Sequence, residues 1–266
     1  KKAVNQIMQI PMNKFSTISS NFICPPWVDV INRLLIARSE SFSYEQYLLE
    51  LLQIECEACR QNRIAHNLRA SKLPPSKTFA NFDKKRLPAM VAAHLNVLAD
   101  GSFLNRCENV LAFGNPGSGK THLLCAIGHQ LIEQGRKVLF IGCSQLVQDL
   151  LIAKRDLVMS KLLKKFSRYD AVILDDIGYV QHSRQEMEVL FTLLADRYER
   201  GSLMITSNLP FSKWEQIFKD PMTTAAAIDR LVHHSMILEL NIESYRMEVA
   251  RKGKSKKPDG PVKGSK

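Results

Sequence analysis

Five short, continuously apolar runs constrain the fold of this chain more than any other feature of its sequence. They are Val110–Phe113, Val138–Ile141, Ala171–Leu174, Leu203–Thr206 and Met236–Leu240. Each run has the length of a strand, and apolar residues do not alternate with polar ones, which is typical of strands buried on both faces of a parallel sheet. Between the third and fourth runs, apolar residues recur at helical spacing. The sequence therefore predicts an α/β domain with a doubly wound, five-stranded parallel sheet.

The composition is that of a globular protein. Of the 266 residues, 45% are hydrophobic and 24% are charged, which excludes a wholly disordered chain and a fibre. No apolar run approaches the roughly 18 residues that a membrane helix needs, and polar residues interrupt the N-terminal apolar residues, unlike a secretory signal. Cys56 and Cys59 form a C-x-x-C pair but lack the second pair of ligands typical of a zinc site. We expect free thiols and a cytoplasmic protein.

A glycine-rich loop follows the first apolar run and precedes a helix predicted over Thr121–Gln134. The loop matches the phosphate-loop pattern G-x-x-x-x-G-K-[ST], in which backbone N–H groups and a helix N-terminus face phosphate oxygens. Lys120 would reach the β- and γ-phosphates, and the Thr121 hydroxyl would bind Mg²⁺. The predicted nucleotide-binding residues of this segment are Gly114, Asn115, Pro116, Gly117, Ser118, Gly119, Lys120, Thr121 and His122.

Polar side chains end the third and fourth apolar runs. Asp175 and Asp176 follow the third run, at the strand end where ligands bind in open α/β sheets. Asp175 is predicted to hold Mg²⁺ and Asp176 to orient the attacking water; the alternative is that the two acids cap a helix. Asn208, after the fourth run, could hydrogen-bond the γ-phosphate or its water, although Ser-Asn-Leu-Pro is also an ordinary turn sequence.

The order of these motifs resembles that of the AAA+ ATPases. Ala227–Ser235 and Glu243–Arg246 resemble the matching segments of the IstB-like ATPases, which assist transposition of insertion sequences, and the DnaC-type helicase loaders are related to them. Upstream, Ser71–Pro74 and Phe79–Asp83 are similar to the linker of that family. The resemblance covers residues 43–250 and implies a three-layer AAA+ fold that binds ATP and Mg²⁺.

The resemblance also implies roles for three polar residues. Asn208 would be the sensor-1 residue, Arg230 the arginine finger and Arg246 the sensor-2 arginine, all by motif position. An arginine finger acts on nucleotide bound by a neighbouring subunit, so hydrolysis depends on assembly. As alternatives, Arg230 could pair with an acid on a solvated face, and Arg246 could pair with Glu243.

The resemblance and the chain composition together predict four segments. Residues 1–70 form a mainly helical N-terminal region, with helices over Trp27–Ala37 and from Ser43 to about Arg69, although residues 1–40 otherwise show no clear pattern. Residues 71–108 form a linker and the start of the ATPase core, and residues 109–250 form the AAA+ domain. The basic residues 251–266 are expected to form a solvated tail.

Two basic segments together carry a charge equal to the whole net charge of +11. Residues 251–266 carry seven basic residues against one acid, and residues 154–168 carry six against one, so the two together equal the whole net charge. The basic residues of the second segment are Lys154, Arg155, Lys161, Lys164, Lys165 and Arg168. Apolar residues between them predict one amphipathic helix whose basic face binds DNA phosphates without sequence preference. The alternative is an ordinary solvated lysine face.

These features together predict an ATP-dependent regulator of DNA transposition. It would assemble into an oligomer on duplex DNA and recruit or stimulate a transposase, with no membrane partner. A DnaC-type loader of a replicative helicase is an alternative, whereas a small-molecule P-loop kinase would not explain the basic segment. Asp176 stands where AAA+ proteins often have the longer glutamate, so hydrolysis should be slow or assembly-dependent. An ATP-binding scaffold with little hydrolysis is the remaining alternative.

Overall fold

In a computed structural model, the described residues are 44–177, 183–210, 213–214, 221–245 and 247. The chain divides into two compact units, residues 1–66 and 67–266. The described part of the first unit belongs to helix α4 (Tyr44–Ser71), which confirms the predicted second helix. The predicted helix over Trp27–Ala37 and the basic tail lie outside the described residues.

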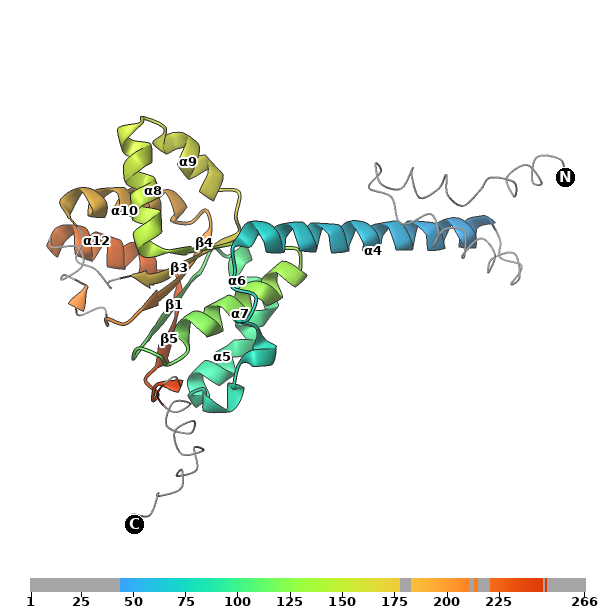
Figure 1. The fold of residues 1–266 in the computed structure, drawn as a ribbon, viewed down its shortest axis with the longest axis horizontal. Helices are drawn as coiled ribbons and strands as arrows, with labels where there is room; N and C mark the ends of the chain where they lie inside the picture. The colour runs from blue at the N-terminus through green and yellow to red at the C-terminus, as the bar shows by residue number, and fades with distance from the viewer. Residues whose placement is uncertain (1–43, 178–182, 211–212, 215–220, 246, 248–266) are drawn as a thin grey trace, which may run out of the picture. The chain divides into compact units, whose positions relative to one another are not determined.

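A parallel sheet forms the centre of the second unit (Figure 1). Its strands are β1 (Asn109–Gly114), β2 (Val138–Gly142), β3 (Ala171–Ile177), β4 (Ser202–Ser207) and β5 (Ser235–Leu240). All pairings are parallel and the spatial order is β2-β3-β4-β1-β5, so the five predicted strands are confirmed. Because β4 lies between β1 and β3, the three strands that lead into predicted site residues are neighbours.

Helices cover both faces of this sheet (Figure 1). Helices α5 and α7 pack on one face, and α8, α10 and α12 lie on the other. The bounds are α5 (Ala89–Asp100), α6 (Ser102–Asn105), α7 (Lys120–Glu133), α8 (Cys143–Arg155), α9 (Met159–Phe166), α10 (Arg184–Arg197) and α12 (Pro221–Val232). All six residues of β4 are buried, whereas only two of six in the edge strand β5 are buried. Burial on both faces is the reason why the central strands read as continuous apolar runs.

The predicted amphipathic helix of residues 154–168 is present as α9, but it does not extend over the whole segment. Helix α8 ends at Arg155 and α9 begins at Met159, and Leu157 between them has a left-handed φ of 56°. The Val158 N–H donates to the Ala153 carbonyl (2.9 Å) and the Leu157 N–H to the Lys154 carbonyl (3.3 Å). This is the Schellman hydrogen-bond pattern, which ends a helix. The sequence does not show it because the left-handed position holds leucine instead of glycine.

Two further expectations concern cysteines and membranes. None of the described cysteines, which are Cys56, Cys59, Cys107, Cys125 and Cys143, forms a disulfide. Within the described ranges, no helix combines the length and the apolar character that a membrane span requires.

Candidate nucleotide site

Backbone geometry shapes the glycine-rich loop into a concave surface between β1 and α7. Gly114 (φ 149°) and Gly117 (φ 80°) have backbone conformations that side chains disfavour. A Cβ at Gly114 would overlap the Leu240 carbonyl group, and one at Gly117 would overlap the Ser244 hydroxyl. The chain therefore needs glycine at both positions, because the last residue of β5 and the segment after it pack directly against the loop.

Lys120, the first residue of α7, lies inside the loop. Its side chain is only 4% exposed, and its ammonium group donates hydrogen bonds to the Gly114 and Asn115 carbonyls at 2.8 Å each. The Ser118 hydroxyl is also buried and has no hydrogen-bond partner among the described residues. A buried cation and an unpaired hydroxyl within a curved backbone are suited to phosphate oxygens.

Asp175 connects three elements at the carboxyl end of the sheet. Its Oδ1 accepts hydrogen bonds from the Thr121 hydroxyl of α7 and the Thr206 hydroxyl of β4, both at 2.7 Å. Thr206 is fully buried, whereas Asp175 is half-buried. The structure therefore brings together Thr121 and Asp175, the two predicted Mg²⁺ ligands.

Asp176 turns out of the sheet beside Asp175. The pairing of β3 with β4 is irregular between Leu174 and Ile177, and Asp176 has a left-handed φ of 62°. Its N–H donates to the Thr206 hydroxyl (2.8 Å), and its Oδ1 accepts from the Asn208 amide (3.0 Å). The bulge therefore presents the Asp176 carboxylate at the surface, next to Asn208. The alternative prediction, that the two acids cap a helix, is not supported: both lie within β3, and Ser183 is the N-cap of α10.

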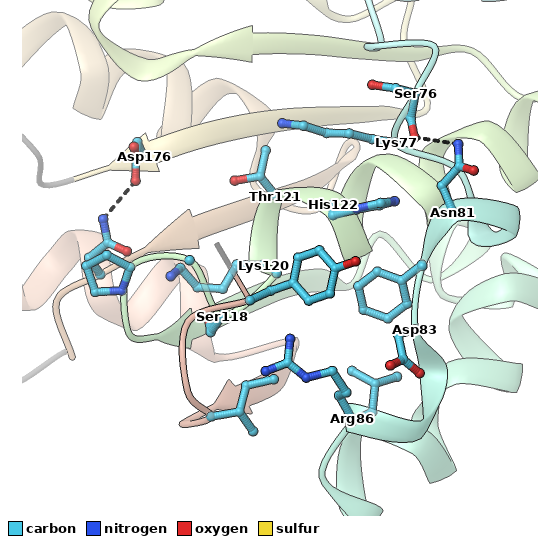
Figure 2. Close-up of a pocket in the computed structure, with 18 residues that line it drawn as sticks. Ser76, Lys77, Asn81, Asp83, Arg86, Ser118, Lys120, Thr121, His122 and Asp176 are labelled. Atoms are coloured by element: carbon cyan, nitrogen blue, oxygen red, sulfur yellow. Dashed lines mark hydrogen bonds between the residues drawn. The ribbon is translucent and has the colours of Figure 1, made fainter. Parts of the chain in front are cut away.

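Thr121, Asp176 and Asn208 line a pocket of about 490 Å³, whereas Asp175 and Thr206 lie outside its lining (Figure 2). Asp176 and Thr121 lie on one side of it, and Asn81 and Arg86 come from the chain before β1 on the other side. The pocket lining comprises Ser76, Lys77, Asn81, Phe82, Asp83, Arg86, Leu87, residues 116–122, Asp176, Asn208, Ile242 and Tyr245. Of the predicted nucleotide-binding residues, Gly114 and Asn115 lie outside this lining and contact Lys120.

Residues before β1 and after β5 meet over the loop. The Arg86 guanidinium donates to the Glu243 carbonyl (3.1 Å) and lies over the Tyr245 ring, 5.2 Å from its centroid. The Tyr245 N–H donates to the Gly117 carbonyl (3.1 Å). On the other side, the Phe82 ring packs edge-on against His122, whose Nε2 lies 3.0 Å from the Thr78 carbonyl. Aromatic and planar groups thus border the phosphate loop.

Burial makes the nearby thiol of Cys143 chemically inert. Burial, and to a lesser extent the negative charge of Asp176, raises the pKa of Cys143 to about 12. The thiol is therefore protonated at neutral pH and does not act as a nucleophile in this region.

The side chains near the phosphate loop suit a Mg²⁺ ion that is bound together with a nucleotide better than a metal ion held by protein ligands alone. The described residues contain no group of three or more histidine, cysteine, aspartate or glutamate side chains that could hold a metal ion. One hydroxyl and one carboxylate, from Thr121 and Asp175, suit Mg²⁺, which keeps water and phosphate oxygens as its other ligands.

Arg230 is not part of this pocket. Its guanidinium donates to the Ala226 carbonyl of α12 (3.1 Å) and lies over the Phe191 ring at 4.8 Å. The next residue, Leu231, accepts a hydrogen bond from the Asn109 side chain at the start of β1, whereas the phosphate loop follows the end of β1. The end of α12 that carries Arg230 is therefore near the amino ends of the strands, whereas the phosphate loop lies at their carboxyl ends. Arg246 lies outside the described residues.

The six basic residues of 154–168 are all exposed. Lys154 pairs with Glu188 (2.6 Å) and Arg155 with Asp156 (3.0 Å), both on the surface. Among the described residues, no ion pair engages the four others, Lys161, Lys164, Lys165 and Arg168. Phe166 of α9 is buried, so α9 has one packed face and one basic face.

Several residues of the site have no role that the sequence predicts. The Thr206 hydroxyl bridges Asp175 and Asp176, and Phe82, Arg86 and Tyr245 border the pocket. The sequence signal for Thr206 is its place as a threonine near the end of a buried strand. The others contact the loop from distant parts of the chain, and no local spacing predicts that contact.

The sequence of this chain is similar to those of known ATP-binding proteins. A family model described as IstB-like ATP binding protein matches residues 31–253. An insertion sequence ATP-binding protein of Sinorhizobium fredii is 42% identical over 219 residues, which cover 82% of this chain and 74% of that protein. An ATP-binding protein of insertion sequence IS21 from Pseudomonas aeruginosa is 36% identical over 216 residues, covering 81% and 82%.

Solved structures show the same fold at lower identity. AMPPCP-bound DnaA from Aquifex aeolicus has a TM-score of 0.55 and 15% identity, and the match covers 72% of this chain and 58% of that chain. The DnaC helicase loader has a TM-score of 0.50 and 19% identity, with 56% and 88% covered. These matches support the AAA+ fold. With the family match, they show that the chain belongs to the IstB-like ATP-binding proteins, AAA+ proteins associated with insertion sequences.

Proposed function

We propose that this ATP-binding protein hydrolyses ATP when it assembles on duplex DNA, and that it then recruits or stimulates a transposase. The observation that carries the proposal is the hydrogen-bonded set Thr121–Asp175–Thr206–Asp176–Asn208 beside Lys120. Two carboxylates are fixed side by side, one against the hydroxyl of the phosphate loop and one at the pocket surface. Binding alone does not need the second carboxylate.

The residues of the pocket divide the work of hydrolysis. The loop N–H groups, Ser118 and Lys120 bind the phosphates and offset their charge. Thr121 and Asp175 would hold Mg²⁺, which supplies further charge neutralisation when bound. Asp176, held by Asn208, would orient the attacking water and accept its proton. Phe82, Arg86 and Tyr245 border the remainder of the pocket and would contact the base.

A second copy of the chain would complete the site. Arg230 lies near the amino ends of the strands, opposite the phosphate loop, and is not among the residues that line the pocket of its own chain. Its guanidinium could stabilise the charge of the transition state in a neighbouring copy. Hydrolysis would then require assembly, in agreement with the short acid at position 176.

The exposed lysines of α9 support DNA as the surface on which assembly occurs. Four unpaired cations on or beside one helix favour binding to phosphates, which needs no base contact. Transposase as the partner is supported by the insertion sequence names of the relatives. The likeness to the DnaC helicase loader concerns the fold. Pull-down by the transposase of the same insertion sequence, in preference to a replicative helicase, tests the choice of partner.

Replacing Asp176 tests whether the site hydrolyses ATP. In Asp176→Asn, we expect ATP binding to be unchanged and DNA-stimulated hydrolysis to fall on the order of a hundredfold, because the water loses its proton acceptor. Asp176→Glu should retain hydrolysis, and Asp149→Asn on α8 is the matched control outside the pocket. Phosphate release and fluorescent-nucleotide binding measure the two properties. If Asp176→Asn and wild type hydrolyse ATP equally fast, this role of Asp176 is refuted. If wild type itself shows no hydrolysis, the protein is an ATP-binding scaffold.

A further inference from the structure

Leu157, at the corner between α8 and α9, is placed against two ordinary preferences of a leucine. Its side chain is 91% exposed, the largest fraction among the exposed large hydrophobic residues of the described chain. Its backbone is left-handed, with φ 56°. Exposure forgoes the free energy gained by burying a large apolar side chain, and the left-handed backbone is unfavourable for any residue with a Cβ.

The end of α7 shows what the fold alone would select at this position. There, the Arg136 N–H donates to the Leu131 carbonyl (3.0 Å) and the Gly135 N–H to the Ile132 carbonyl (2.8 Å). This is the hydrogen-bond pattern that surrounds Leu157, and Gly135 occupies the left-handed position with φ 87°. Glycine or asparagine would serve the corner between α8 and α9 equally well or better.

The other non-glycine residues with positive φ in the described chain do not share this combination. They are Lys72, Cys107, Asp176 and Glu199. Lys72 and Glu199 are exposed but polar, Cys107 is half-buried, and Asp176 belongs to the nucleotide pocket. Leu157 is a large aliphatic side chain in a strained position that no packing contact requires. A local departure of this kind points to a role outside the fold.

The surroundings of Leu157 identify the chemistry of the partner. Exposed basic residues precede it at Lys154 and Arg155 and follow it at Lys161, Lys164 and Lys165. A projecting apolar side chain between exposed cations matches the arrangement by which proteins insert leucine, isoleucine or methionine between base pairs from the minor groove. A protein partner would need a wider apolar surface than one side chain. A membrane would need an amphipathic helix with several apolar residues.

We propose that Leu157 is a wedge that enters a base step of duplex DNA and partly unstacks it, while the lysines of α9 bind the flanking phosphates. This inference rests on the proposed DNA binding and adds a contact to the bases. It requires no sequence motif, because any step that unstacks readily, such as TA, accepts the side chain. The nucleotide site and the DNA contact are then separate parts of one chain.

The test uses full-length protein with ATP and a duplex whose TA steps carry 2-aminopurine, which fluoresces more strongly when unstacked. Wild type and Leu157→Met, which keeps an apolar tip, should raise the fluorescence about twofold or more at saturation. Leu157→Asn and Leu157→Gly suit the left-handed backbone, so they should fold at least as stably as wild type and abolish the rise. Met90→Gln removes another exposed apolar side chain (77%) from α5 and should behave as wild type.

The outcomes separate the wedge from the proposed DNA binding. If Leu157→Asn binds the duplex and still raises the fluorescence as wild type does, the wedge is refuted and DNA binding stands. If Leu157→Asn changes only transposase stimulation, Leu157 contacts the protein partner and the wedge is again refuted. If wild type does not bind the duplex, the proposed function fails together with the wedge.

Discussion

A single hydroxyl group, that of Thr206, holds both acidic residues of the site. It donates to the Asp175 carboxylate and accepts from the Asp176 N–H, at 2.7 and 2.8 Å. The phosphate loop is predictable from the sequence because its pattern is local and its residues are consecutive. The role of Thr206 is not predictable in this way, because it depends on the register and irregularity of β3 against β4.

Thr206→Val tests this positioning role at the scale of one residue. Valine has nearly the same shape but removes both hydrogen bonds, so Asp175 and Asp176 lose their fixed orientation. We expect kcat for ATP to fall about tenfold to a hundredfold, with little change in nucleotide affinity. Thr206→Ser, which keeps the hydroxyl, should restore most of the rate. A fall in affinity and rate together, without rescue by serine, would indicate that Thr206 only supports the fold.

At the scale of elements, Arg197 of α10 connects α9 to the sheet. Its guanidinium is buried and donates to the carbonyls of Phe166, Tyr169, Asp170 and Ser202, at 2.8–3.3 Å. Burial lowers the pKa of Arg197 to about 10, so the group stays protonated at neutral pH. One charged side chain therefore holds the end of α9 and the start of β3 and β4 together.

Arg197→Met should destabilise the protein by about 3–5 kcal/mol, because it leaves several buried carbonyl groups without a donor. Arg197→Lys, with fewer donors in a different geometry, should lie between methionine and wild type. Urea unfolding followed by circular dichroism measures the difference. A loss below about 1 kcal/mol for methionine would mean that water replaces the lost donors.

The basic face of α9 gives a prediction on the salt dependence of DNA binding. Changing Lys161, Lys164 and Lys165 to glutamine should reduce the slope of log K against log salt by about 2.7, since each phosphate contact contributes about 0.9. The matched control changes three other exposed lysines, Lys72, Lys137 and Lys213. Fluorescence anisotropy of a labelled duplex measures the slopes. Equal slopes for the two triple variants would show that the α9 lysines are only solvated.

The sequence predicts the elements of the core better than the corners between them. All five strands lie where continuous apolar runs predict them, because burial on both faces leaves a signal in every residue. The corner between α8 and α9 is missed because Leu157 carries no turn signal. The contact of Arg86 with Tyr245 is missed because the two residues lie far apart in the chain.

At the scale of the whole molecule, the proposed hydrolysis site is divided between the two ends of the strands, with the nucleotide pocket at one end and the proposed arginine finger near the other. The phosphate loop and Asp176 lie at the carboxyl ends of the strands, and Arg230 lies near their amino ends. A site divided in this way is complete only between two copies arranged head to tail. The proposed dependence of hydrolysis on assembly follows from this separation.

Mixing two inactive variants tests this claim most directly. Lys120→Ala inactivates the nucleotide pocket of its own copy and keeps Arg230. Arg230→Ala removes the proposed arginine finger and keeps the pocket intact. With DNA, each variant alone should show almost no ATPase activity, and an equal mixture should recover about a quarter of the wild-type rate, because half of the pockets are intact and half of their neighbours supply Arg230. If the mixture stays inactive although sedimentation shows both variants in one assembly, Arg230 does not act in trans and the account is contradicted.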